Sequence, residues 1–321
     1  MHSDDLSIQL TDIYEHFYQF LPSNKKIIEF QRTNRIVDFL VDETYLLRVS
    51  SRKLDELERL QRVQSVRRVP KIYNHGEIVI DGENYHYLIL DYIQGAELNS
   101  CIQSLTNEQN FDFGKDIADF LVSLHSIKDS KYDIGHYIPT IPRYEHSWRE
   151  GHLEYLEYLE VELSKLELSL ASRNTIDVAI DYIKKHISCL DHMRGPMLLH
   201  NDLHPKNIII HNGKLSGVID WECSQFGEPD FELTHLFHWS IYPTVEGNNL
   251  DNLLTSVFDH FIKRFNVPEI GKRLTIYQIE HEMNQLIWNG SRQEQERIMR
   301  INKWLSGQIE DMIIRWSNLR Q

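Results

Sequence analysis

Short apolar stretches bounded by polar turns fill the first 92 residues of the chain. Residues 53–69 are an exception, because leucine and valine recur there at helical spacing until Pro70 ends the pattern. Asp81-Gly82 lies between two of the apolar stretches and is a strong hairpin signal. The pattern predicts a small N-terminal domain of antiparallel strands with one helix. The predicted strands lie at residues 27–30, 36–41, 44–49, 78–80 and 85–90.

Beyond residue 92 the apolar positions recur mainly at helical spacing. Strand-like residues return at 197–220, where two apolar runs flank Asn212-Gly213, the best short-range hairpin signal in the chain. We therefore predict an α+β protein in which residues 93–321 form a mostly helical domain with one embedded hairpin. The predicted helical segments are residues 111–125, 153–170, 176–189 and most of 250–319.

Composition narrows the possible partners. Acidic residues outnumber basic ones by 48 to 34, which gives a formal charge of −14, so we expect no nucleic-acid partner. No apolar run approaches the roughly 18 residues of a membrane span, and the acidic N-terminus lacks the layout of a signal peptide. The three cysteines are widely spaced and form no disulfide framework. These features predict a cytoplasmic protein without a membrane partner.

The predicted hairpin gathers candidate chemistry at its open end. Asn207 precedes Asn212-Gly213 by five positions and Asp220 follows that pair by seven, so folding at the turn brings Asn207 and Asp220 together. Asp202 lies five residues before Asn207, on a loop that Pro205 stiffens. Carboxylate and amide oxygens suit a hard cation such as Mg²⁺.

These residues match a known pattern. His200-x-Asp202-x-x-x-x-Asn207, followed after the hairpin by Asp220 and then by the segment 227–233, resembles the catalytic core of the aminoglycoside phosphotransferase and choline kinase-like enzymes, which are relatives of the protein kinases. The resemblance is sharpest over residues 198–233. It implies a bilobal protein-kinase-like fold, with a nucleotide-binding lobe at residues 1–92 and a helical lobe at residues 93–321 that carries the catalytic loop and the acceptor pocket.

The resemblance also implies roles for the matched residues. Asp202 accepts or orients the proton of the acceptor hydroxyl, and His200 braces the loop. Asn207 and Asp220 hold the Mg²⁺ ions that bridge the phosphates. Glu232 stands where the family usually has an aspartate that supports the loop.

In the N-terminal lobe the resemblance implies a strand cation paired with a helix carboxylate. The cation falls on Arg48, where arginine replaces the usual lysine. The carboxylate falls on Glu56, with Glu58 as the alternative if the helix register differs by two. The turn at residues 31–35 has no glycine, and Thr33 or Asn34 is a candidate phosphate contact.

The segment 91–95 corresponds to the hinge of that family, so backbone groups of Asp91 and Ile93 are expected to bind the purine. Leu90 would lie at the back of that pocket and leave room for adenine. We therefore expect ATP as the donor, with GTP as an open alternative.

Only nine positions separate Asp220 from Pro229, which in this family comparison favours a small-molecule acceptor over a protein. A glutamate-rich helix at 149–167 suits a cationic acceptor, although charge runs are more often solvated faces. Alternative sources of acidic groups are Asp230, Glu280 and Glu282.

The leading functional hypothesis is an antibiotic O-phosphotransferase of the aminoglycoside type. The alternatives are a metabolic kinase acting on choline, an amino alcohol or a sugar derivative, and a catalytically silent kinase-like binding protein. A zinc hydrolase using His200, Asp202 and His204 is a weaker hypothesis, because it leaves the spacing of Asn207 and Asp220 unexplained. The sequence leaves the choice between monomer and dimer open.

Overall fold

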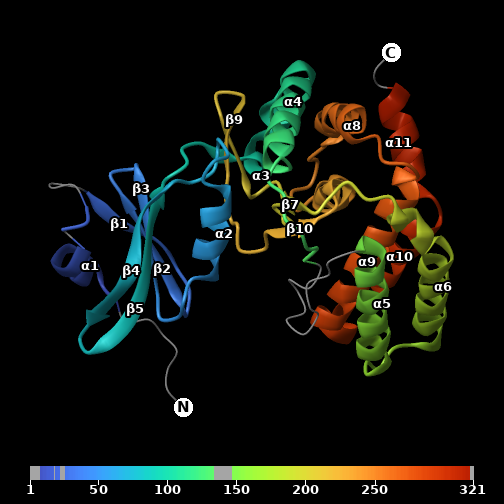
Figure 1. Ribbon diagram of the computed structural model, residues 1–321, viewed down its shortest axis with the longest axis horizontal. Coiled ribbons are helices and arrows are strands. Elements are labelled where there is room, and N and C mark those ends of the chain that lie inside the picture. Colours follow the sequence, from blue (N-terminus) through green and yellow to red (C-terminus); the bar gives the residue numbers. More distant parts are fainter. Residues whose placement is uncertain (1–7, 18, 22–25, 134–146, 319–321) are drawn as a thin grey trace. The chain divides into compact units, whose positions relative to one another are not determined.

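The computed structural model describes residues 8–17, 19–21, 26–133 and 147–318. Most of its elements are labelled in Figure 1. The chain forms two compact units. Unit 1 comprises Met1–Leu98 with Lys206–Glu222, and unit 2 comprises Asn99–Pro205 with Cys223–Gln321.

Unit 1 is built on a five-stranded antiparallel sheet with the strand order β1-β2-β3-β5-β4 (Figure 1). Two helices accompany it, α1 (Leu10–Phe17) and α2 (Asp55–Val63). The apolar side of α1 packs on the sheet, where Ile13 and Phe17 join its buried core. The strands are β1 (Ile27–Arg32), β2 (Ile36–Val41), β3 (Tyr45–Ser50), β4 (Ile72–Ile80) and β5 (Glu83–Asp91).

The Asn212-Gly213 hairpin forms as its sequence predicts, with positive φ angles of 51° and 74° at the two turn residues. It joins β8 (Ile208–His211) to β9 (Lys214–Val218). Its grouping differs from the expected division of the chain, which placed it in the domain 93–321. The hairpin belongs to unit 1 because β8 pairs with β6 (Ala96–Glu97) and the Val218 N–H donates to the Arg68 carbonyl.

Unit 2 is mostly helical. Its longest helix, α9 (Ile270–Asn289), is buried along most of its length and contacts α5, α6, α7, α10 and α11. The other helices are α3 (Leu98–Cys101), which begins on the last residue of unit 1, α4 (Asn107–Leu124), α5 (Trp148–Ser164), α6 (Leu170–His186), α7 (Leu233–Ile241), α8 (Asp251–Phe265), α10 (Glu294–Leu305) and α11 (Gln308–Asn318).

Two short strands interrupt these helices, β7 (Met197–Leu199) and β10 (Gln225–Gly227), and they pair antiparallel. The strand β7 leads into the loop that carries His200 and Asp202, and β10 leads to a 3₁₀ turn at Pro229–Glu232. Four 3₁₀ turns complete the described elements of the chain, and the other three are Ile102–Ser104, Ile187–Asp191 and Gly290–Gln293.

The predicted elements match the observed ones in kind, with shifted boundaries. The helix expected at 53–69 ends at Val63, and the strand expected at 78–80 is longer, beginning at Ile72. The helix α1 was not predicted, because its eight residues give too short a periodic pattern. Among the described residues, no helix is both long and apolar enough to span a bilayer.

Candidate active site

Each unit contains a cavity of its own, and we call them the unit 1 cavity and the unit 2 cavity. The unit 1 cavity has a volume of about 500 Å³ and is lined by side chains of the sheet, of α2 and of the hairpin. Its walls combine apolar residues with a cluster of charged groups. The apolar members include Leu46, Leu90, Ile93, Ile209 and Ile219, and the polar ones include Asp38, Arg48, Glu56, Asn207 and Asp220.

Arg48 is the centre of the charged cluster. Antiparallel pairing sets Arg48 on β3 opposite Asp38 on β2, and two parallel hydrogen bonds of 2.9 Å join the guanidinium Nε and Nη2 to the Asp38 carboxylate. Nη1 of Arg48 donates to the carboxylate of Glu56, in the first turn of α2. An arginine side chain has five N–H groups. Described residues accept hydrogen bonds from three of those of Arg48, so two N–H groups remain for an oxygen atom of a ligand.

The electrostatic balance of this cluster is negative. Arg48 has a raised pKa because Glu56, Asp38 and Asp220 outweigh the effect of burial. Burial, together with the negative charges of Asp220 and Asp38, raises the pKa of Glu56 in spite of its bond to Arg48. Three carboxylates therefore surround one guanidinium, and a cation bound beside them would relieve their mutual repulsion.

Asn207 and Asp220 lie together in this cavity, as the hairpin geometry predicts. The backbone carbonyl of Asn207 accepts a hydrogen bond of 2.9 Å from the N–H of Ile219, which holds the two ends of the hairpin side by side. Asp220 has a φ of 66°, a left-handed conformation that is costly for a residue with a side chain. Both residues line the cavity, and each has a side chain that carries oxygen.

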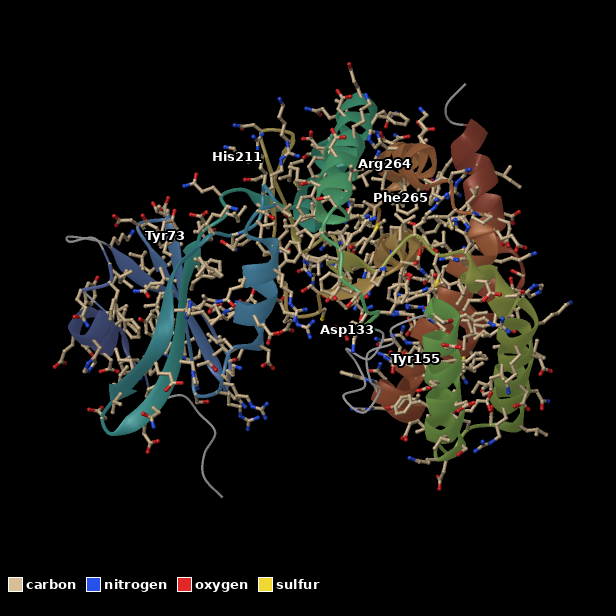
Figure 2. The ribbon with its side chains drawn as sticks, viewed as in Figure 1. Tyr73, Asp133, Tyr155, His211, Arg264 and Phe265 are labelled. Atoms are coloured by element: carbon tan, nitrogen blue, oxygen red, sulfur yellow. The ribbon has the colours of Figure 1, made fainter. Side chains whose placement is uncertain are left out.

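The segment after β5 borders the apolar part of the cavity. The N–H of Asp91 is bonded to the Lys71 carbonyl, whereas no described residue accepts a hydrogen bond from the N–H of Ile93. Leu90 is 3% exposed and lies in the lining. Tyr73 on β4, labelled in Figure 2, is hydrogen-bonded to the Asp91 side chain, which raises the pKa of the tyrosine to about 12.

The structure separates the other residues predicted for this site. Glu58 is exposed and bonds to Arg62, so the carboxylate that meets Arg48 is that of Glu56. Thr33 and Asn34 are outside the lining of the cavity. The Thr33 hydroxyl accepts hydrogen bonds from the N–H groups of Arg35 and Ile36 and so closes the turn between β1 and β2. A phosphate contact by either residue stays a prediction.

Asp38 is the residue of this site that sequence reasoning missed. It is 4% exposed, in the middle of the apolar run 36–41. An acidic side chain in a buried strand needs a partner, and this was the available signal. The identity of the partner depended on the register of β2 against β3.

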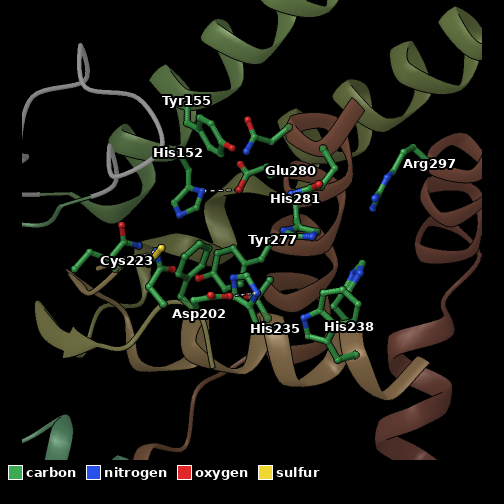
Figure 3. Close-up of a pocket in the computed structure, with 17 residues that line it drawn as sticks. His152, Tyr155, Asp202, Cys223, His235, His238, Tyr277, Glu280, His281 and Arg297 are labelled. Atoms are coloured by element: carbon green, nitrogen blue, oxygen red, sulfur yellow. Dashed lines mark hydrogen bonds and ion pairs between the residues drawn. The ribbon is translucent and has the colours of Figure 1, made fainter. Parts of the chain in front are cut away.

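The unit 2 cavity has a volume of about 290 Å³ and is shown in Figure 3. Asp202 lies in its wall, and Nδ1 of His235 on α7 is 3.4 Å from the Asp202 carboxylate. Burial and the neighbouring His238 lower the pKa of His235 to about 3. His235 is therefore neutral at pH 7, so it lies beside the Asp202 carboxylate without neutralising its charge.

The loop that carries Asp202 is held by hydrogen bonds to Glu232. The fully buried carboxylate of Glu232 accepts hydrogen bonds from the N–H groups of His200 (2.7 Å) and Asn201 (3.1 Å). Burial alone would raise the pKa of Glu232, but interactions with His125 and with His200 lower it. Nδ1 of His200 in turn accepts a hydrogen bond of 3.3 Å from the N–H of Asp202. The bracing role of this histidine stays a prediction.

The candidate acidic groups for an acceptor are not equivalent. The helix α5 contributes His152 and Tyr155 to the unit 2 cavity, and none of its glutamates lies in the lining. Glu160 and Glu162 of this helix pair instead with Lys184 and Lys165. The geometry therefore favours a solvated face for the glutamates of α5.

The described parts of the chain do not support a zinc site formed by His200, Asp202 and His204. Among the described parts of the chain, no group of three or more His, Cys, Asp or Glu side chains has the geometry to hold a metal ion. His200 and Asp202 are used within the loop described above, and the ring of His204 packs against Trp239 with 4.2 Å between centroids.

Residues 28–255 match the model of the phosphotransferase enzyme family. The chain belongs to this family. The matched range includes every residue to which the sequence assigned a role in catalysis or nucleotide binding.

Known members of the same group are similar to this chain in fold. A thermostable mutant of aminoglycoside phosphotransferase APH(4)-Ia, solved with AMP-PNP and hygromycin B, has a TM-score of 0.65 at 16% identity, with 91% of this chain and 97% of that chain covered. The streptomycin–ATP complex of APH(2'')-IIa has a TM-score of 0.63 at 17% identity, with 95% and 99% covered. The chain therefore has the kinase-like fold of the aminoglycoside phosphotransferases, with a sheet unit and a helical unit, as the motif resemblance predicted.

A shorter match is found in sequence. The hygromycin-B 4-O-kinase of Escherichia coli is 36% identical over 42 residues, which are 13% of this chain and 12% of that protein. The match thus spans a small fraction of either protein.

Proposed function

We propose that this chain is an ATP- and magnesium-dependent O-phosphotransferase whose acceptor is a hydroxyl group of an aminoglycoside-type antibiotic. The observation that carries the proposal is that the two cavities differ in the groups that line them. The unit 1 cavity holds an apolar slot, a backbone donor and a charged cluster, which suit a nucleoside triphosphate. The unit 2 cavity holds a carboxylate on an anchored loop, which suits a hydroxyl group that must lose its proton.

The unit 1 cavity supports ATP as the donor. A purine ring fits between apolar side chains such as Leu46 and Ile219, with the Ile93 N–H available as a donor to a ring nitrogen. The remaining N–H groups of Arg48 supply hydrogen bonds to phosphate oxygens. The solved relatives that contain ATP or AMP-PNP support the same choice.

The residues of this cavity also fit Mg²⁺. Asn207 and Asp220 provide oxygen ligands, and the excess negative charge around Arg48 favours a cation. When bound there with the nucleotide, the ion would neutralise developing charge on the phosphates. Two protein ligands are sufficient, because Mg²⁺ usually keeps several waters and takes phosphate oxygens as further ligands.

In the reaction, the acceptor hydroxyl forms a new P–O bond with the γ-phosphorus of ATP as the bond to ADP breaks. The hydroxyl proton passes to the carboxylate of Asp202, whose backbone N–H is bonded to His200 within the loop. Glu232 keeps the two preceding N–H groups fixed, so the carboxylate of Asp202 loses little freedom when the acceptor binds.

An antibiotic acceptor is supported by the relatives, which include a hygromycin kinase and phosphotransferases solved with streptomycin and hygromycin B. One observation favours the second candidate, a kinase of choline or a related amino alcohol. The unit 2 cavity is small, at about 290 Å³, and several of its walls are aromatic, including Tyr155, Phe231, Tyr277 and Trp239. Such walls suit a compact quaternary ammonium group.

The test is a coupled assay of ADP release with Mg²⁺ and ATP. The panel contains hygromycin B, streptomycin, gentamicin, choline and ethanolamine, and it is run on the wild type and on Asp202→Asn. The control is Asp177→Asn, which removes the same charge from an exposed position on α6. We expect Asp202→Asn to keep its ATP affinity and to lose about 10²- to 10⁴-fold in turnover.

The outcomes separate the candidates. Turnover with an aminoglycoside that falls in Asp202→Asn and not in Asp177→Asn supports the proposal. Turnover with choline alone supports the second candidate. ATP binding without turnover of any compound in the panel identifies a nucleotide-binding protein and refutes the proposed activity, and unchanged turnover in Asp202→Asn refutes the role of that residue.

A further inference from the structure

The strand β1 is both an edge of the sheet and part of the wall of the unit 1 cavity. Among the described strands it pairs with β2 alone. Two of its residues, Phe30 and Gln31, line the cavity. Because an edge strand has one ladder of hydrogen bonds where a central strand has two, contacts outside the sheet matter more for its position.

A β-bulge explains why two consecutive residues of β1 reach the same cavity. The register shifts between Glu29, which lies opposite Phe39, and Gln31, which lies opposite Asp38. Phe30 is the extra residue between them, and a bulge of this kind redirects a side chain. Gln31 therefore shares the cavity face with Asp38, whereas Glu29 shares the opposite face with Phe39, which belongs to the core of the unit.

The face of β1 opposite the cavity is bonded to residues 8–17, which we call the N-terminal segment. Arg32, the last residue of β1, lies opposite Val37 of the same core. Its Nη2 donates a hydrogen bond of 2.8 Å to the backbone carbonyl of Ile8. Its Nε and Nη2 also donate to the carboxylate of Glu29, at 2.8 and 2.7 Å. One guanidinium thus joins the two residues that flank the bulge on this face to the N-terminal segment.

The N-terminal segment is itself fixed to the sheet, and Figure 1 shows α1 beside it. Ile8 and Phe17 are buried in the core of the unit, and the ring of Phe17 lies edge-on to that of Tyr87 on β5, with 5.3 Å between centroids. The hydroxyl of Tyr14 accepts a hydrogen bond of 3.3 Å from the N–H of Ile27, the first residue of β1. The segment is therefore bonded to β1 at both ends of the strand.

The two cavity-facing residues of the bulge are suited to contact a ligand. Phe30 is 52% exposed, and its ring lies edge-on to that of Tyr92, with 5.8 Å between centroids. No described residue is hydrogen-bonded to the carboxamide of Gln31. A carboxamide supplies two N–H donors and an oxygen acceptor, and an aromatic ring supplies apolar surface. A nucleotide in the cavity would use both.

We infer that the N-terminal segment sets the shape of the nucleotide cavity, with Arg32 as a positioning residue that holds the bulge so that Phe30 and Gln31 face the ligand. The segment lies before residue 28, where the match to the family model begins. The inference rests on the proposed function, because it assigns the unit 1 cavity to ATP.

The experiment compares Arg32→Gln with the wild type by titration calorimetry with AMP-PNP and Mg²⁺. Glutamine shortens the side chain and removes its charge. Arg62→Gln is the matched control, because Arg62 is 27% exposed against 31% for Arg32 and likewise pairs with a glutamate close in sequence. Glu29→Gln tests the ion pair across the bulge separately, and Arg32→Lys tests for rescue by a retained cation.

We expect Arg32→Gln to weaken AMP-PNP binding about 3- to 10-fold, because a hydrogen bond from a partly exposed charged group is lost and binding must then order the bulge. Arg62→Gln and Glu29→Gln should bind AMP-PNP as the wild type does, and Arg32→Lys should recover part of the loss. In the ADP-release assay, the KM for ATP should rise and the KM for the acceptor should not change.

Hydrogen–deuterium exchange separates this role from a general loss of stability. In Arg32→Gln, exchange should become faster in peptides from residues 8–17 and 27–36 and stay unchanged in residues 72–91, which contain β4 and β5. A protein that is merely destabilised would exchange faster in all three regions.

Three results would overturn the inference. They are wild-type AMP-PNP affinity in Arg32→Gln, an equal loss in Glu29→Gln, which would assign the effect to the ion pair alone, and a wild type that does not bind AMP-PNP. Failure of the transferase activity would look different. AMP-PNP binding that weakens in Arg32→Gln, without ADP release in the presence of any acceptor, would support the inference and refute the activity.

Discussion

The pairing of Arg48 with Asp38 offers a direct test of how the guanidinium of Arg48 is held in the unit 1 cavity. The perturbation is a double-mutant cycle of Asp38→Asn, Arg48→Gln and the two together. In the wild type, two parallel bonds of 2.9 Å join the side chains, of which the carboxylate is 5% exposed and the guanidinium 23% exposed. Either single substitution therefore leaves a largely buried charge without its main partner.

The magnitude follows from the number and burial of the bonds. Hydrogen bonds to charged groups contribute about 1.5–3 kcal/mol each, and the partial exposure of Arg48 reduces their sum by solvent screening. We expect a coupling free energy of about 2–3 kcal/mol between Asp38 and Arg48. The exposed pair Glu58–Arg62 in α2 serves as a control, and a surface pair at this spacing should give about 0.3–0.5 kcal/mol.

The two units of the chain need not unfold together, so the free energy of opening is measured locally. Hydrogen–deuterium exchange of peptides from β2 and β3 reports it for each protein in the cycle. The KM for ATP provides a second readout, which should rise in Asp38→Asn because Arg48 is no longer held in place for phosphate oxygens. A coupling below about 0.5 kcal/mol, no larger than that of the surface pair, would refute the reasoning that Asp38 positions Arg48.

Three further substitutions test other parts of the structure. Gly95→Ala should raise the KM for ATP and lower stability by about 1–3 kcal/mol. The reason is that Gly95 has a φ of 141° and that a Cβ there would lie 2.4 Å from the Ile210 carbonyl oxygen. ATP titration and thermal melting check this, and a wild-type KM would contradict it. Arg273→Met should destabilise unit 2 by about 3–5 kcal/mol, because Asp230 loses a fully buried partner, and chemical denaturation should show partial recovery when Asp230→Leu is added. His235→Asn should make the protein less sensitive to acid. The pKa of His235 is lowered from its ordinary 6.5 to about 3 on folding, so the unfolded chain binds more protons below pH 6.5 and stability falls as the pH decreases toward 3. This residue alone should cost the wild type about 2 kcal/mol between pH 7 and pH 5, and equal losses in wild type and variant, measured by urea denaturation at both pH values, would exclude the effect.

Local pattern was sufficient for much of this fold. The Asn212-Gly213 pair predicts a hairpin because both residues tolerate positive φ, and the structure has positive φ at both. The alternation of apolar runs and turns located the five strands of the sheet, with β4 beginning earlier than expected. The spacing of Asp202, Asn207 and Asp220 identified the family, which the match over residues 28–255 shows.

Other features depended on tertiary structure. The family resemblance implied that Arg48 and Glu56 are partners. The sequence showed that Asp38 needs a partner, but only the register of β2 against β3 set it beside Arg48. The hairpin joins the sheet unit, although a contiguous division would assign it to the helical domain. The proximity of Asp202 to Asn207 and Asp220 stays a prediction, since Asp202 belongs to unit 2 and the other two to unit 1.

The amino-acid sequence by itself determined the elements, the hairpin and the chemical types of the site residues, because these follow from backbone preferences and periodicities over a few positions. Only the tertiary structure decided which charges are neutralised. Asp230, Glu280 and Glu282 are all candidate acceptor-binding acids in the sequence, yet arginines bind the first and the last, whereas Glu280 lies 2.7 Å from Nδ1 of His152. That difference arises because the partners of these carboxylates come from other elements of unit 2, and the packing of those elements on α9 brings together residues that are far apart in the chain.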